Sequence, residues 1–194
     1  MKRAGGDWSQ DRRTPAPCYP RNMLRLWRHA AGLLLALTLS ACGQSAPPPG
    51  VTDINGIMPA LELSMIRAND GAAVSARDYL GKVSVLYFGY THCPDVCPTT
   101  LSNLSLALGS MGEDADKVRV LFISVDPDRD TLPVLKSYVN AFAPQIDGLR
   151  GSANDIARLA RRYRVAYSVT SASATQTYEV THSNSVFFFD ARGH

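Results

Sequence analysis

A buried strand that runs directly into a pair of cysteines constrains this chain more than any other feature. The apolar and aromatic run 83–88 has almost no polar interruption, as expected of a strand buried on both faces of a sheet. Cys93 and Cys97 follow it, each before a proline, and Pro98 suits the first turn of a helix over 98–111. The pair is therefore predicted at a helix N-terminus. There the unpaired backbone N–H groups and the helix dipole favour thiolate, the form that attacks disulfides and binds metals.

The charge of the chain is concentrated at its N-terminus. Residues 1–30 hold seven of the 20 Lys and Arg residues but only two of the 17 acids, so the remainder carries 13 bases against 15 acids. A length of 194 residues allows one domain with a sound core. Because that domain is slightly acidic, we expect no nucleic-acid partner.

The N-terminal region has the parts of a secretory signal. Arginines precede an apolar run at 30–39, which is too short to span a bilayer, and small residues follow it. This pattern predicts a signal peptide over 1–41, with Met23 as a possible true start; an uncleaved anchor or a buried helix is the alternative. The residues around Cys42 resemble the lipobox of bacterial lipoproteins, which predicts lipidation of Cys42 and a flexible, lipid-anchored tether over 42–56. The predicted location is the periplasmic side of a bacterial cell envelope, on the membrane.

Cysteine usage separates the folded domain from the leader. Cys18 lies in the predicted signal region and Cys42 is the predicted lipid site, so Cys93 and Cys97 are the two thiols of the domain. Two thiols in an exported domain form either one disulfide or one metal site.

The domain over 57–194 alternates strand-like and helix-like segments. We expect an N-terminal β-hairpin over 61–80, then strands and helices that build a mixed or mostly parallel central sheet with helices on both faces. Ligands gather at the carboxyl ends of the strands in such folds. Beyond the strand and helix that flank the cysteines, the predicted elements are a strand over 118–125, helices over 131–142 and 153–163, and strand-like segments at 178–180 and 185–189.

The spacing of the two cysteines suits a metal better than a disulfide. Residues at i and i+4 of a helix have Cβ atoms roughly 5–6 Å apart, which is slightly wide for a disulfide but within reach after local adjustment. Soft thiolates select Cu(I), zinc or iron–sulfur clusters. Closed zinc sites and clusters usually take four protein ligands, whereas two cysteines are available here.

His182 is the candidate third ligand. It lies 85 residues after Cys97, beside the strand-like segment at 185–189. Two thiolates and one imidazole form a set suited to copper, although a lone histidine is more often structural. His92, next to Cys93, is the competitor and is near enough to influence the pKa of that thiol.

A charged turn follows the second buried strand. Asp126 and Arg129 in this turn are candidates to support the metal loop or to dock a partner. The alternative is a solvated loop with a helix cap. Asp95, between the cysteines, is a weak candidate that is expected to serve the local turn geometry.

Three motifs in order resemble the Sco/SenC family. They are YFGYTHCPDVCPTTL at 87–101, SVDPDRDT at 124–131 and VTHSNSVFFFD at 180–190, and the resemblance covers roughly residues 50–194. The resemblance implies a thioredoxin-like fold, tethering to a membrane, and binding of copper, as Cu(I) or Cu(II), by two cysteines and one histidine. These ligands correspond to Cys93, Cys97 and His182.

The family resemblance implies a copper metallochaperone that serves the CuA site of cytochrome c oxidase subunit II. A three-coordinate Cu(I) site leaves room for a thiolate of the recipient, and another copper chaperone or a dithiol reductant would be a further partner. The alternative is an enzyme, a thiol–disulfide reductase that keeps the CuA cysteines reduced by forming a Cys93–Cys97 disulfide.

Two departures from the family pattern are apparent. Thr181 stands where many relatives have an acid, and relatives usually continue past Asp190–Gly193, so the domain is expected to be incomplete at its C-terminus with an exposed sheet edge.

Overall fold

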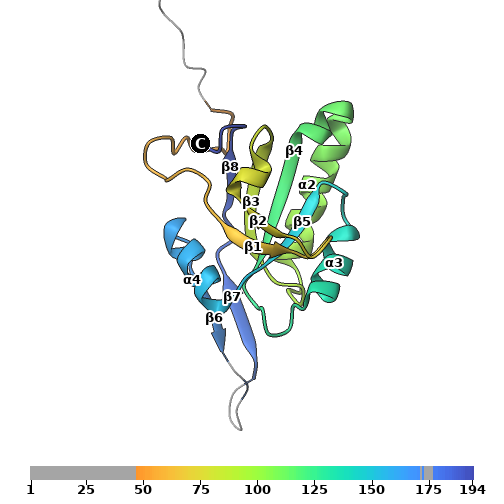
Figure 1. Cartoon of the computed structure of the whole chain (residues 1–194), viewed down its shortest axis with the longest axis vertical. Coiled ribbons are helices and arrows are strands. Elements are labelled where there is room, and N and C mark those ends of the chain that lie inside the picture. The colour runs from red at the N-terminus through yellow and green to blue at the C-terminus, as the bar shows by residue number, and fades with distance from the viewer. Residues whose placement is uncertain (1–46, 171, 173–176) are drawn as a thin grey trace, which may run out of the picture. The chain divides into compact units, whose positions relative to one another are not determined.

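Two parallel strands, β3 (Val83–Gly89) and β4 (Val118–Ser124), form the centre of the computed structural model (Figure 1). They pair over their whole length, from Val83 opposite Val118 to Gly89 opposite Ser124. The structure describes residues 47–170, 172 and 177–194. The chain divides into two units, Met1–Thr52 and Asp53–His194, and the described strands and helices lie in the second.

A six-stranded sheet grows from this central pair. β5 runs parallel to β4, whereas β1 and β8 run antiparallel to β5 and β3 respectively, and the order is β2-β1-β5-β4-β3-β8. The remaining strands of this sheet are β1 (Ser64–Arg67), β2 (Ala73–Ser75), β5 (Ile146–Arg150) and β8 (Val186–Phe189). The predicted N-terminal hairpin is confirmed as β1 and β2, but it is part of the sheet because β1 pairs with β5.

Helices cover both faces of the sheet, as the sequence predicted (Figure 1). Along β3, Val85 and Tyr87 face the layer of α2 (Val96–Ser110) and α3 (Leu132–Asn140). Leu86 and Phe88 point the other way, toward α4 (Ala153–Arg162). This alternation follows from the two-residue period of a strand. Short 3-10 turns complete the elements at η1 (Ala76–Tyr79) and η2 (Gly112–Lys117).

Local sequence signals set most of the helix starts. Ser152 caps α4 and Asp155 returns the bond to the Ser152 backbone, the capping box that the sequence predicted. Thr131 is the N-cap residue of α3, although its side chain makes no capping hydrogen bond. Helix α2 begins at Val96, two residues before the predicted start at Pro98. Proline is tolerated there because the first N–H groups of a helix have no partner within it.

Two strands were not predicted from the sequence. β5 carries Asp147 and Gly148, which are unusual in a central strand. The structure explains Gly148, because a Cβ there would lie 2.7 Å from Cγ of Leu135 on α3. The other unpredicted strand is β6 (Tyr167–Thr170), which pairs antiparallel with β7 (Glu179–His182).

β6 and β7 form a sheet of their own. In the described residues neither strand has a backbone ladder to the six-stranded sheet. The hairpin instead contacts the domain through side chains such as the buried Val180, which lies in the same apolar cluster as Val125 and Tyr163. This arrangement matters for the site because β7 ends at His182.

Several predictions concern residues at the ends of the chain. The signal region 1–41 and Cys42 lie outside the described residues, and of the 42–56 tether only 47–56 is described, with 47–53 exposed. β8 borders the sheet, and Phe188 on it is 56% exposed. Within the described ranges no helix combines the length and the apolar character that crossing a bilayer requires.

Candidate metal centre

The two cysteines lie at the carboxyl end of β3 but in different local structures. Cys93 lies in the turn that precedes α2, where its N–H donates to the carbonyl of Tyr90 over 3.3 Å, and Cys97 is the second residue of α2. The pair lies at the start of a helix as predicted, but the helical i and i+4 geometry expected for the two residues is wrong because Cys93 precedes α2. The backbone N–H of Cys97 donates to Sγ of Cys93 over 3.4 Å, so the helix start still faces the first sulfur.

A glycine at the end of β3 makes room for the second cysteine. A Cβ at Gly89 would lie 2.8 Å from Sγ of Cys97 and 2.6 Å from Cε2 of Phe122. Real side chains do not approach this closely. Gly89 is therefore needed for Cys97 to pack, fully buried, against the strand.

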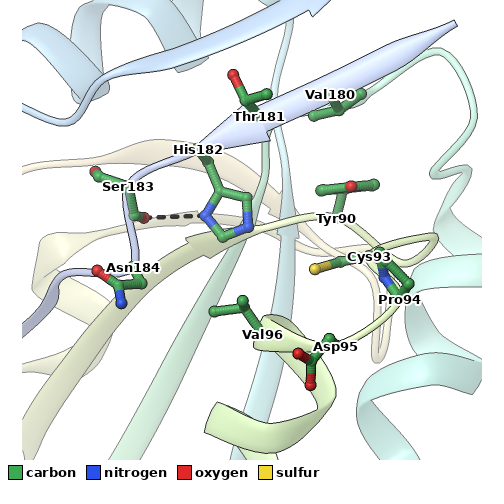
Figure 2. Close-up of a pocket in the computed structure, with 10 residues that line it drawn as sticks. All are labelled: Tyr90, Cys93, Pro94, Asp95, Val96, Val180, Thr181, His182, Ser183 and Asn184. Atoms are coloured by element: carbon green, nitrogen blue, oxygen red, sulfur yellow. Dashed lines mark hydrogen bonds between the residues drawn. The ribbon is translucent and has the colours of Figure 1, made fainter.

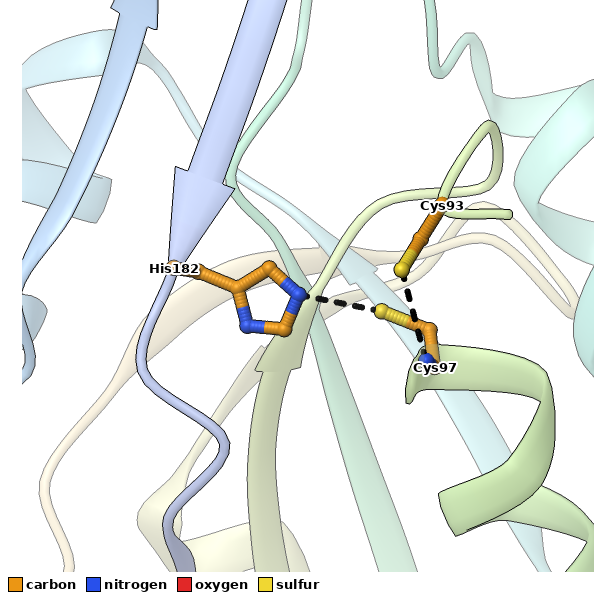
Figure 3. Close-up of side chains that lie close together, drawn as sticks. All are labelled: Cys93, Cys97 and His182. Atoms are coloured by element: carbon orange, nitrogen blue, oxygen red, sulfur yellow. Dashed lines mark hydrogen bonds between the residues drawn. The ribbon is translucent and has the colours of Figure 1, made fainter. Parts of the chain in front are cut away.

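His182 reaches the cysteines from the end of β7. Its Nε2 lies 3.2 Å from Sγ of Cys97 (Figure 3). Its Nδ1 lies 2.9 Å from the carbonyl oxygen of Ser183 (Figure 2). A carbonyl oxygen only accepts, so Nδ1 carries the proton of the neutral imidazole and donates it to Ser183. The lone pair of Nε2 therefore faces the sulfurs, the arrangement of a metal-binding histidine held by a backbone carbonyl.

The structure brings the three predicted ligands together. The Sγ atoms of Cys93 and Cys97 and a ring nitrogen of His182 all lie within 4.8 Å of one another. Both thiols are free in the structure. A pocket of about 410 Å³ opens beside them, and Figure 2 shows Cys93 and His182 facing each other across it, with Asp95 and Val96 on the side of the helix start.

The two thiols differ in acidity. Burial raises the pKa of Cys93, but the N–H groups of Cys97, Asp95 and Val96 outweigh it, so the pKa lies below its ordinary value. Burial raises the pKa of Cys97 to about 12. Cys93 is therefore the readily ionised, accessible sulfur, and Cys97 is the buried one.

Aromatic rings enclose the histidine. The ring of Tyr87 meets that of His182 edge-on with centroids 6.0 Å apart, and the ring of Tyr90 does so at 5.8 Å. His92, the competing histidine, does not join the site. Its side chain is 53% exposed, and its Nδ1 lies 3.0 Å from Oγ1 of Thr91.

The charged turn after β4 is not a solvated loop. Asp126 and Asp130 are both fully buried, whereas Asp128 between them is exposed. Asp126 accepts from Nε of Arg129 and from the hydroxyl of Tyr178, each over 2.5 Å. Asp126 thus contacts Arg129 and Tyr178, and the predicted support of the metal loop by Asp126 or Arg129 stays a prediction.

Asp130 fixes the segment that leads to Cys93. It accepts from the N–H and the hydroxyl of Thr91 over 3.0 and 2.6 Å, and from the hydroxyl of Ser124 over 2.6 Å. Asp130 was not among the site residues predicted from the sequence. Its position just before a helix-forming segment suggested only a turn, and the bond to Thr91, 39 residues away, has no signal in the sequence.

Asp95 contributes to the helix start rather than to the cluster of donor atoms. It is the exposed N-cap residue of α2, and its carboxylate accepts a hydrogen bond over 3.3 Å from Oγ1 of Thr99. This agrees with the expected role in local turn geometry.

The chain belongs to the SCO1/SenC family, whose model matches residues 65–194. It is 40% identical over 141 residues to the mitochondrial protein SCO1 homolog 1 of Arabidopsis thaliana, covering 72% of this chain and 40% of that protein. It is 41% identical over 118 residues to the mitochondrial SCO2 homolog of Bos taurus, covering 60% of this chain and 44% of that protein. The chain thus spans less than half the length of these curated relatives.

A solved structure of a relative shares the fold. The copper-bound structure of ScoI from Bradyrhizobium japonicum aligns with a TM-score of 0.63 at 40% identity, covering 69% of this chain and 84% of that one. The predicted thioredoxin-like architecture, a mixed sheet flanked by helices, is confirmed by this likeness and by the strand order.

The predicted localisation is contradicted by the curated relatives. These are mitochondrial Sco proteins, not lipoproteins on the periplasmic side of a bacterial envelope. The prediction was wrong because a basic stretch followed by a short apolar run and small residues does not specify one targeting route.

Proposed function

We propose that this chain is a copper metallochaperone that binds one copper ion through Cys93, Cys97 and His182 and takes part in cytochrome c oxidase assembly. The observation that carries the proposal is the convergence of these three donor atoms within 4.8 Å. Membership of the SCO1/SenC family and the copper-bound ScoI structure support it.

The chemistry of the donors favours copper over other metals. Two thiolates and one neutral imidazole form a soft set for Cu(I), and Cu(II) also accepts a mixed sulfur and nitrogen set. In the described residues the cluster has three donors, short of the four that a closed zinc site takes. The carbonyl of Ser183 fixes the His182 tautomer that presents Nε2 to the metal.

The recipient that we propose is the CuA site of cytochrome c oxidase subunit II. A three-coordinate Cu(I) leaves one position for an incoming thiolate, so the ion passes by ligand exchange and no net redox change is required. The pocket beside Cys93 and His182 supplies the access. Another copper chaperone is the donor that we propose on the loading side.

A thiol–disulfide reductase is the second candidate, and the unequal acidity of the thiols favours it. The Cys93 thiolate would attack a disulfide of the recipient and form a mixed disulfide, releasing one recipient thiolate. Cys97, once deprotonated, would then attack Sγ of Cys93, forming the Cys93–Cys97 disulfide and releasing the second thiolate. The recipient gains two electrons and this chain loses two, which a dithiol reductant restores.

Substitution of the histidine separates the two functions. The full chain, reduced and anaerobic, is loaded with Cu(I) as wild type, His182→Ala and His92→Ala, and its copper stoichiometry and visible spectrum with Cu(II) are recorded. The chaperone proposal expects one copper and a thiolate-to-Cu(II) charge-transfer band in wild type and His92→Ala, and loss of both in His182→Ala. Wild type without copper, but with cysteines that cycle with a dithiol, would instead establish the reductase.

A further inference from the structure

The hairpin that carries His182 depends on side chains for its position. Within the described ranges, β6 and β7 hydrogen-bond to each other and not to the six-stranded sheet, which holds the segments that carry the cysteines. Cys97 packs directly against Gly89 of β3, whereas no backbone ladder joins β7, which carries His182, to that strand. The position of the histidine must come from the contacts of β7 and its flanking residues.

Tyr178 provides one such contact at the start of β7. It lies four residues before His182, and Val180 lies between them, so the three side chains share one face of the extended chain. Val180 is buried in the core. The hydroxyl of Tyr178 donates to Oδ1 of Asp126 over 2.5 Å, which ties this face of the hairpin to the end of β4.

Arg129 completes a closed set of contacts with Tyr178. Its Nε donates to Oδ2 of Asp126 over 2.5 Å, so both oxygens of this fully buried carboxylate are used. Its guanidinium carbon lies 4.1 Å from the ring centroid of Tyr178, a stacking distance at which the ring face attracts a cation. Tyr178 is thus held at its hydroxyl and at its ring.

The same arginine also reaches the ring that contacts the histidine. The guanidinium carbon of Arg129 lies 5.8 Å from the ring centroid of Tyr90, and the Tyr90 ring meets the His182 ring edge-on. Tyr90 and Asp126 continue the neighbouring strands β3 and β4, which are joined there by the bond from Val125 N–H to the Gly89 carbonyl. These contacts link the ends of the central strands to both ends of β7.

We propose that Asp126, Arg129 and Tyr178 form a positioning cluster that holds the β6–β7 hairpin so that His182 faces the two cysteines. The inference rests on the proposed function, because it takes His182 as a copper ligand. The cluster does not touch the metal. It raises the fraction of molecules in which the third ligand is in place, and the apparent affinity for copper scales with that fraction.

The test compares two tyrosines of the same hairpin in the full chain. Tyr178→Phe keeps the ring and removes the hydroxyl that reaches Asp126, whereas Tyr167→Phe makes the same chemical change on β6, opposite His182. Amide hydrogen exchange is measured in the copper-free proteins, and Cu(I) affinity by competition with a chelator. Arg129→Lys, which keeps the charge and loses the planar stack, is the second variant.

We expect Tyr178→Phe to speed exchange at the amides of β7 and to weaken Cu(I) binding by about three- to thirty-fold. Exchange in β3 and β4 should stay unchanged, and Tyr167→Phe should match wild type in both measurements. Arg129→Lys should act in the same direction as Tyr178→Phe.

The outcomes separate this inference from the proposed function. Equal β7 exchange in Tyr178→Phe and Tyr167→Phe overturns the positioning cluster, even where wild type binds copper. If Tyr178→Phe speeds amide exchange in β7 but wild type binds no copper, the positioning cluster is confirmed as what holds the hairpin. The same result rejects the proposed function.

Discussion

Nε2 of His182 lies 3.2 Å from Sγ of Cys97, although 85 residues separate the two in the chain. The sulfur is attached to the domain core through α2 and the close packing at Gly89, whereas the nitrogen arrives on a hairpin outside the main sheet. The proposed metal centre therefore joins two parts of the fold that have different supports, and substitutions in each part should have distinct effects.

Gly89→Ala should damage the site from the side of the sheet. The added Cβ would lie 2.8 Å from Sγ of Cys97, so either the sulfur or the strand must shift. We expect a loss of about 1–3 kcal/mol in the free energy of unfolding, as in overpacked cores, together with weaker Cu(I) binding. Gly109→Ala is the control, because a Cβ there meets nothing within 4 Å and alanine favours the helix. Urea unfolding and chelator competition measure both effects, and a fully stable, copper-binding Gly89→Ala would show that the strand end tolerates a side chain.

The two cysteines should react at different pH values. The pKa of Cys93 lies below the ordinary thiol value of about 8.5, whereas burial raises the pKa of Cys97 to about 12. In the metal-free protein we expect the rate of iodoacetamide modification to reach its midpoint at a lower pH in Cys97→Ser, which keeps Cys93, than in Cys93→Ser, which keeps Cys97. Rate against pH, followed by mass spectrometry, gives each midpoint. Equal midpoints in the two variants would show that the N–H groups at the start of α2 do not favour the Cys93 thiolate.

The same shifts predict opposite contributions to stability. The folded-state pKa of Cys97 is raised, so its stabilising contribution is full below the unfolded value of about 8.5 and is lost as the pH rises toward 12. The pKa of Cys93 is lowered, so its contribution is present above about 8.5 and is lost as the pH falls through the folded-state pKa. Between about pH 8.5 and 10, Cys97→Ser should therefore lose less stability with rising pH than wild type does. Denaturant midpoints across this range provide the measurement.

Asp130→Asn should loosen the segment that leads into the first cysteine. The buried carboxylate accepts three hydrogen bonds, two from Thr91 and one from Ser124, and an amide would place a donor against donors. We expect a loss of about 2–4 kcal/mol in the free energy of unfolding. The matched control is the exposed Asp128→Asn in the same turn, for which we expect a change within about 0.5 kcal/mol. If urea unfolding gave the same free energy of unfolding for Asp130→Asn and wild type, the role of Asp130 in holding Thr91 would be rejected.

Ser152→Ala should change stability without changing the site. It removes the N-cap of α4, whose helix packs on the face of the sheet opposite α2. We expect a loss of about 1 kcal/mol in the free energy of unfolding and an unaltered Cu(I) affinity. A thermal melt and a copper titration of the same samples check this. Weaker copper binding in this variant would mean that the Cu(I) affinity depends on the overall stability of the domain rather than on the local contacts of the site.

Elements with strong local signals could be predicted from the sequence. A pattern of a few neighbouring residues was enough to predict each of these elements. They are the apolar strands β3 and β4, the capping box of Ser152 and Asp155, and the turn of the N-terminal hairpin. β5 could not be recognised in this way, because its Asp147 and Gly148 oppose the usual strand composition. Both residues have neighbours that are distant in the chain. A guanidinium nitrogen of Arg67 on β1 lies 3.8 Å from a carboxylate oxygen of Asp147, and Leu135 on α3 packs against Gly148.

The predicted ligands came together in the structure, but their surroundings had to be seen there. The spacing of Cys93 and Cys97 indicates a metal or redox site, and the family resemblance identified His182 as the third ligand. The partners of Asp126 were not predicted, since Tyr178 is 52 residues away from it in the chain. One signal was present, because Tyr178 and His182 are four residues apart and fall on the same face of a strand.

The separate β6–β7 sheet has a consequence for how long the ion stays bound. Two of the proposed ligands, Cys93 and Cys97, lie beside the central sheet, and the third, His182, lies on a separate hairpin. We therefore expect the imidazole to leave the copper without disturbing the core. We expect the residence time of bound copper to depend on the contacts of the β6–β7 hairpin, and the melting temperature to depend on the central sheet. If the proposed function is correct, substitutions in the β6–β7 hairpin should change the rate of copper release without changing the melting temperature.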